Sequence, residues 1–70
     1  MKILKLDYKK VDLILARKQM MIKELSQLSG IAESALVKIK KGKQIPRPAT
    51  IGKIAKALDV DVTELIEQED

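Results

Sequence analysis

The sequence predicts an all-α domain of five short helices, two of which are joined by a tight turn near its centre. Apolar residues recur three and four positions apart along most of the chain, the spacing that places side chains on one face of a helix. Gly30 interrupts this spacing where a sharp reversal needs a residue that tolerates positive φ. Pro46 and Pro48 mark a second break before the last part of the chain.

Length and composition limit the kinds of protein that fit. The 70 residues form one small domain over 1–70, and a chain of this size buries only about 60% of its unfolded surface. There is no cysteine or histidine, which removes disulfides and the usual zinc ligands and general bases. Apolar runs are too short for a membrane span or a signal peptide. We therefore expect a cytoplasmic protein with no cofactor, no bound metal and no enzymatic activity.

Charge is distributed unevenly along the chain. Residues 1–47 carry twelve Lys and Arg against four Asp and Glu, a balance of +8, whereas residues 48–70 carry two Lys against six acids, a balance of −4. Together they give the net charge of +4. This distribution favours contact of the basic end with a polyanion, but a mixed, solvated surface explains it equally well.

The first third of the chain predicts an arm followed by a helix. Residues 1–6 form an N-terminal arm or short strand, with a flexible terminus as an open alternative. Asp7 is a good N-cap for a helix over Tyr8–Lys18. The inner face of this helix is a stripe with a lysine at its open end: Val11, Ile14, Leu15 and Lys18. Met20 is expected to fill the core in the next turn, and Met21 to act as filler.

The stretch 22–41 is predicted as two helices that pack through an apolar seam on either side of Gly30. The seam consists of residues three apart in each helix and one in the turn: Leu25, Leu28, Ile31, Leu36 and Ile39. Ser26 is small where the two helices approach most closely. The solvent side of the second helix then carries Glu33, Ser34, Val37, Lys38 and Lys41.

The last part of the chain predicts two further helices. Pro48 suits the first turn of a helix over Pro48–Leu58, whose apolar face is Ile51, Ile54, Ala55 and Leu58. Gly52 costs this helix roughly 1 kcal/mol relative to alanine, which close packing would justify. An Asp61–Glu64 capping box begins a fifth helix, and 67–70 form a frayed acidic tail. The apolar residues of this last helix and of the arm are the apolar surfaces available for association: Val62, Leu65, Ile66, Ile3, Leu4 and Leu6.

Residues 11–66 resemble the Cro/CI-type helix-turn-helix domain of the XRE (lambda-repressor-like) family. The apolar seam with Ser26 and Gly30 matches, the IKKGK run over 39–43 is similar to the family's exit from its third helix, and Thr50–Ile66 resembles its fourth and fifth helices. The resemblance implies a five-helix, sequence-specific regulator of transcription, a repressor. It would bind double-stranded DNA as a homodimer on a palindromic site. Apart from the resemblance, we expect no membrane contact, and the sequence shows no evident small-molecule ligand, although it leaves open whether an effector exists.

The resemblance also implies which residues contact DNA, because the second helix of the motif lies in the major groove. The base-reading candidates are Ala32, Glu33, Ser34, Val37 and Lys38. The phosphate-binding candidates are Lys23, Lys41, Lys43 and Gln44. Lysines 40, 41 and 43 are open to a second interpretation as a solvated helix end.

Several positions depart from the family pattern. Met21 and Ile22 stand where the family often has a hydroxyl cap and a glutamine, Ala32 where a polar cap is usual, and Asp59 where glycine is frequent. Glu33 either accepts a hydrogen bond from cytosine or stabilises the helix dipole, and the sequence does not separate these. A protein-interaction module of the same fold, such as an antitoxin-like partner, is the alternative function.

Overall fold

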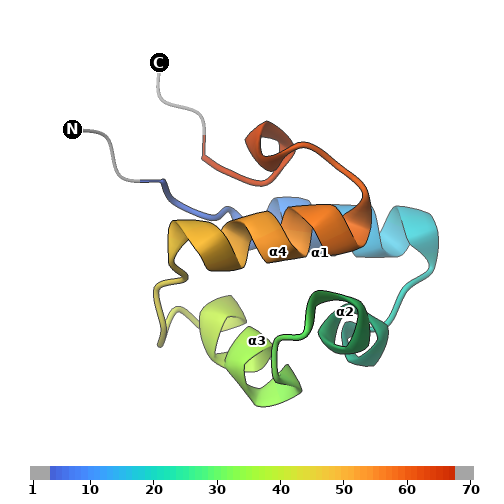
Figure 1. Ribbon diagram of the computed structural model, residues 1–70, viewed down its shortest axis with the longest axis horizontal. Helices are drawn as coiled ribbons and strands as arrows, with labels where there is room; N and C mark the ends of the chain where they lie inside the picture. The colour runs from blue at the N-terminus through green and yellow to red at the C-terminus, as the bar shows by residue number, and fades with distance from the viewer. Residues whose placement is uncertain (1–3, 68–70) are drawn as a thin grey trace.

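The computed structural model of the protein describes residues 4–67, which form four α-helices and one 3-10 helix. In chain order they are α1 (Tyr8–Lys18), α2 (Ile22–Ser29), α3 (Glu33–Lys40), α4 (Pro48–Leu58) and η1 (Val62–Glu64). In Figure 1 α1 and α4 run across the molecule, α2 and α3 lie below them, and η1 lies above. The all-α fold class is confirmed, with a correction to the number of α-helices from five to four.

Local sequence determines where α1 and α4 begin and end. The Asp7 carboxylate accepts a hydrogen bond from the backbone N–H of Lys9 at 3.1 Å, which caps α1 as predicted. Gln19 ends α1 in the left-handed conformation, at φ 54°. Asp59 ends α4 in the same way at φ 56°, a conformation that aspartate tolerates better than most residues.

The core lies between α1 and α4, and α2, α3 and Leu65 contribute further side chains to it. All the apolar positions predicted on α1 and α4 are buried: Val11, Ile14, Leu15, Ile51, Ile54, Ala55 and Leu58. Leu25 and Leu36 are fully buried and Ile39 is nearly so. Met20 packs against this core as predicted, together with Ile31 from the turn.

The prediction that Leu28 belongs to the seam is wrong, because its side chain is 61% exposed. The inward face of α2 consists of the fully buried Leu25 and the half-buried Ile22, Ser26 and Ser29. Successive residues are about 100° apart around a helix, so these four cluster on one side and Leu28 lies more than a quarter turn from their centre. Met21 is also not filler, since it is 70% exposed.

The predicted fifth helix is reduced to the single 3-10 turn of η1. Its capping box is present, because the Thr63 N–H donates to Asp61 Oδ2 at 3.0 Å and the Asp61 N–H donates to Glu64 Oε2 at 3.3 Å. From Leu65 onward, backbone N–H and carbonyl groups that would continue a helix form hydrogen bonds with another segment of the chain. The capping signal therefore predicted the start of the element but not its length.

The backbone groups after η1 pair with the N-terminal arm instead. Leu6 and Ile66 form an isolated antiparallel bridge. The Asp7 N–H donates to the carbonyl of Leu65, and the Glu67 N–H to that of Lys5, both at 2.8 Å. The arm is thus paired from Lys5 to Asp7, but it forms one bridge rather than a strand.

This pairing also reduces the apolar surface that was expected to be available for association. Leu65 is fully buried in the core, and Leu6 and Ile66 are half-buried and paired with each other. Ile3 and the tail residues 68–70 lie outside the described residues. The large apolar side chains that remain exposed within residues 4–67 are Leu4, Leu13, Met21, Leu28 and Ile45.

Candidate nucleic-acid interface

The turn between α2 and α3 is held by two serine hydroxyls. Gly30 ends α2 at φ 75°, and its N–H donates to the carbonyl of Ser26 at 2.9 Å. The Ser26 hydroxyl donates to the carbonyl of Ile31 at 2.6 Å, and the Ile31 N–H donates to Ser29 Oγ at 3.2 Å. The angle between the helices is therefore fixed by polar contacts as well as by the seam. Sequence reasoning treated Ser26 only as a small residue and missed this role.

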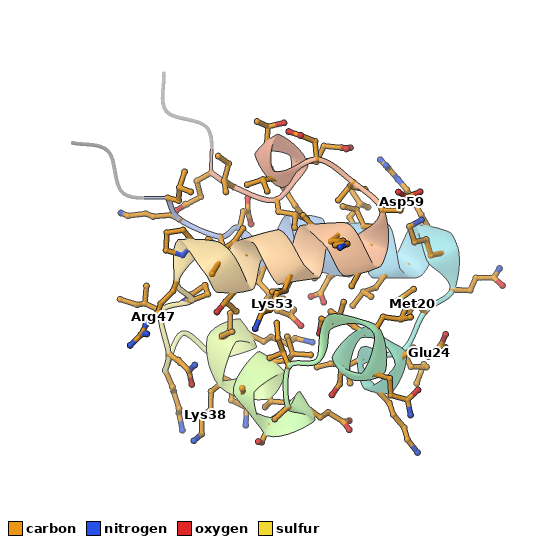
Figure 2. The ribbon with its side chains drawn as sticks, in the orientation of Figure 1. Met20, Glu24, Lys38, Arg47, Lys53 and Asp59 are labelled. Atoms are coloured by element: carbon orange, nitrogen blue, oxygen red, sulfur yellow. The ribbon has the colours of Figure 1, made fainter. Side chains whose placement is uncertain are left out.

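The two faces of α3 have opposite character. Leu36 and Ile39 are buried against the core, whereas Glu33, Ser34 and Lys38 are exposed. Figure 2 shows Lys38 at the outer end of α3, directed away from the rest of the domain. Val37 departs from the expected exposed set, because it is half-buried.

The N-termini of α2 and α3 have no side-chain cap. Met21 precedes α2 and Ala32 precedes α3, and neither side chain can accept a hydrogen bond from the first turn. The Ala32 carbonyl accepts from Ala35 and Leu36, at 3.0 and 3.1 Å, as the first links of the helical ladder. The N–H groups that open each helix are therefore left to water or to a bound anion.

A dense positive cluster follows α3. Lys41, Lys43 and Gln44 are all exposed in the turn after the helix. Gly42 adopts φ 75°, and the Lys43 N–H donates to the carbonyl of Lys38 at 2.9 Å, which folds the turn back onto the helix end. The turn thus brings three of the four phosphate candidates together, next to the base-reading candidate Lys38.

The fourth phosphate candidate, Lys23, lies apart on the first turn of α2, where it is exposed. The start of α2 nevertheless faces the end of α3 across one depression of about 750 Å³. Met21 and Ile22 line it from α2, and Val37 and Lys41 from the α3 side. This geometry places the beginning of α2 beside the positive cluster.

A comparison with protein families identifies this arrangement. The family model for the Cro/C1-type HTH DNA-binding domain matches residues 10–70. The chain belongs to the Cro/C1-type helix-turn-helix family. The resemblance expected from the sequence is thereby confirmed, and the chain is a DNA-binding regulator. No curated protein matches the chain, and neither does any solved structure.

Arg47 is a further exposed cation beside the helix-turn-helix, and it was not among the residues that the sequence predicted. Arg47 is exposed at the N-cap of α4, in the loop stiffened by Pro46 and Pro48. Figure 2 shows Arg47 and Lys38 toward the same end of the domain. In the sequence, the position of Arg47 between two prolines could have identified it, because prolines hold a neighbouring charge in a defined place.

Lys40 differs from its neighbours because it faces α1. Its Nζ lies 3.9 Å from Asp12 Oδ2, and both side chains are about half exposed. Such an exposed pair contributes little stability, in the range of about 0–1 kcal/mol. Lys40 is thus partly neutralised, whereas Lys38, Lys41 and Lys43 form no ion pair within the described part of the chain.

The described residues were also compared with the features of a membrane span and of a metal site. No helix within residues 4–67 is long and apolar enough to cross a bilayer. In the same range no three of the potential metal-ligating side chains gather into a group that could hold an ion.

Proposed function

We propose that the protein is a sequence-specific repressor of transcription that places α3 in the major groove of double-stranded DNA. The observation that carries the proposal is the two-sided character of α3. Its inner side is anchored by the fully buried Leu36, while Ser34 and Lys38 stand on a rigid outer side, next to the lysine-rich turn. A rigid helix with one solvated polar face is what base reading in the major groove requires.

Each base-reading candidate has a chemical role on this face. Lys38 donates to guanine O6 and N7, and Ser34 donates to a base or a phosphate. Glu33 accepts from cytosine N4, which compensates for its repulsion by the backbone. Ala32 allows close approach at the helix start. The half-buried Val37 contacts a thymine methyl only through its exposed part.

Phosphate contacts set the register of the helix on the duplex. Lys41, Lys43 and Gln44 bind the backbone on one side of α3. Lys23 and the uncapped N-terminus of α2 bind it on the other. These contacts are independent of sequence, so they raise affinity for all duplexes and make it fall with salt.

The repressor acts as a homodimer on a palindromic site. A two-fold axis between two copies of the domain presents two α3 helices to successive major grooves, with half-sites about 34–36 Å apart. Selection of bound duplexes from a random-sequence library at about 150 mM salt tests this proposal. We expect enrichment of a palindrome, and the absence of any enrichment over non-specific binding rejects sequence-specific recognition.

The substitutions Lys38→Ala and Lys43→Ala separate reading from positioning. Loss of Lys38 should cost roughly 1–3 kcal/mol of discrimination at one base pair. Loss of Lys43 should weaken binding to every sequence and flatten the slope of log K against log salt by about one. Both are measured by titrating selected and scrambled duplexes over a range of salt. Identical behaviour of the two variants contradicts the assigned roles.

A second candidate function is that of a protein-interaction module with this fold. It is favoured by the apolar side chain of Met21, which is 70% exposed at the start of α2 where DNA contact is otherwise proposed. A partner that co-purifies with the chain and is lost in Met21→Ser or Glu33→Ala, while DNA affinity stays unchanged, supports it. Equal loss of DNA affinity in these variants supports the repressor instead.

A further inference from the structure

Ile45 is the most exposed of the large apolar side chains within residues 4–67. It is 83% exposed and lies in the loop between α3 and α4. The loop is fixed on both sides of it, by the hydrogen bond from Lys43 to the carbonyl of Lys38 and by the ring of the half-buried Pro46. An isoleucine is therefore held in solvent by a stiff loop, which favours binding because little ordering remains to be done.

A hollow of about 320 Å³ lies directly beside Ile45. It is lined by the apolar residues Leu6, Tyr8, Ile39, Ile45 and Pro46, together with Gln44 of the lysine-rich turn. Lys5 and Glu67 also line the hollow and give it one charge of each sign. In Figure 1 the arm, the end of the described chain and this loop all lie on the left side of the molecule, around the start of α4.

We propose that this face is where two copies of the chain associate, with Ile45 of one copy entering the hollow of the other. The projection and the hollow lie side by side on one surface, and a two-fold interface requires such a self-complementary surface. Lys5 and Glu67 carry opposite charges, so the same rotation brings Lys5 toward Glu67 of the partner subunit. The inference rests on the proposed homodimer and names its surface.

Charge also distinguishes a second copy from DNA as the occupant. Glu67 lines the hollow, so its carboxylate would repel the phosphates if DNA covered this face. A second copy instead supplies both an exposed apolar side chain and a lysine for that glutamate.

Sedimentation analysis of the full chain without DNA, from about 10 μM to about 1 mM, tests the proposal. We expect a monomer–dimer equilibrium that Ile45→Asp weakens by at least about tenfold, because each dimer loses two buried isoleucines. Leu13→Asp and Leu28→Asp are matched controls, since these leucines are 55% and 61% exposed elsewhere on the surface. They should associate like the unaltered chain, and circular dichroism verifies folding of all three variants.

An isotope-filtered NMR experiment on a mixture of labelled and unlabelled chains locates the contact. Tyr8 is the only aromatic residue of the chain, so a signal between Ile45 methyls of one copy and the ring of the partner's Tyr8 identifies the interface. A monomer throughout the concentration range, or loss of association in the leucine controls but not in Ile45→Asp, overturns the proposal. Because the test contains no DNA, its failure leaves the DNA-binding proposal standing, and a chain that associates but selects no duplex refutes only the latter.

Discussion

The helix starts of this domain fall into two groups. At α1 and η1 an aspartate, Asp7 or Asp61, accepts hydrogen bonds from the first turn, whereas α2 and α3 follow Met21 and Ala32, which cap nothing. A missing cap costs a helix about 1 kcal/mol. α4 also begins without a side-chain cap, at Arg47, but Pro48 in its first turn has no N–H to satisfy. In the helix-turn-helix, both helices leave their first-turn donors open to phosphate. The two helices that we propose contact DNA thus both lack the stabilisation that a side-chain cap provides.

If α2 and α3 depend on packing against the scaffold, truncating the buried side chain that joins α2 to the core should lower the free energy of unfolding more than any other change proposed here. Leu25→Ala removes a fully buried side chain and should lower the free energy of unfolding by about 2–5 kcal/mol. Leu28→Ala, three residues away on the exposed side of α2, should change it by no more than about 0.5 kcal/mol. Urea unfolding followed by circular dichroism measures both. Similar losses at the two positions would contradict the observed orientation of α2.

Supplying the missing cap of α3 tests the comparison directly. Ala32→Ser and Ala32→Asp both offer an acceptor to the first-turn N–H groups and should raise the free energy of unfolding by about 1 kcal/mol. Both should weaken DNA binding, because the donors are no longer free. The aspartate variant should weaken it more than the serine variant, because its charge repels phosphate. Unchanged DNA affinity in both variants would place the start of α3 away from the duplex.

The difference between local and long-range contacts explains which parts of the fold the sequence could predict. The buried faces of α1 and α4 follow from apolar spacing, and their ends from residues such as Asp7, because those signals act within one or two turns. The length of η1 could not be predicted, because it depends on pairing of Leu65 and Glu67 with the distant arm. The prediction that Leu28 is buried failed, because a spacing of three residues leaves open which flank of Leu25 faces the core.

The candidate interface was predictable in kind but not in geometry. Exposure of Ser34 and Lys38 follows from the burial of Leu36 and Ile39 on the same short helix. The sequence did not reveal that Ser29 and Ser26 hold the turn or that Lys40 faces Asp12, because these contacts depend on the angle between elements. The exposure of Ile45 was equally hidden, because it depends on the path of the loop.

The scaffold is not optimised throughout, and Tyr8 on α1 is its first weak point. The Tyr8 hydroxyl is buried and has no hydrogen-bond partner among the described residues. Tyr8→Phe removes this unsatisfied group and should raise the free energy of unfolding at neutral pH by about 1 kcal/mol. Urea unfolding at pH 7 measures the gain. A loss of stability instead would mean that the hydroxyl is bonded in solution.

The same residue predicts a dependence on alkaline pH. Burial, and secondarily the nearby Asp12 carboxylate, raise the pKa of Tyr8 above its ordinary value of 10.0. Above pH 10 the unfolded chain therefore loses this proton first, the folded state binds more protons, and stability falls as pH rises through the folded pKa. Tyr8→Phe should lack this component, and the difference between the two proteins removes the lysine titrations they share. Parallel curves would contradict the raised pKa.

Gly52 in α4 is the second weak point of the scaffold and gives the smallest expected effect. Apart from its chain neighbours and the nearby backbone of α4, no heavy atom lies within 4 Å of the position a Cβ would take there, so close packing does not account for the glycine. Gly52→Ala should therefore raise the free energy of unfolding by about 0.5–1 kcal/mol, through helix propensity alone. Gly42→Ala is the matched control, because the same open space surrounds it but its φ is +75°. There alanine should destabilise the domain by about 1–2 kcal/mol. Opposite signs in urea unfolding would establish that backbone conformation, and not available space, decides where this domain needs glycine.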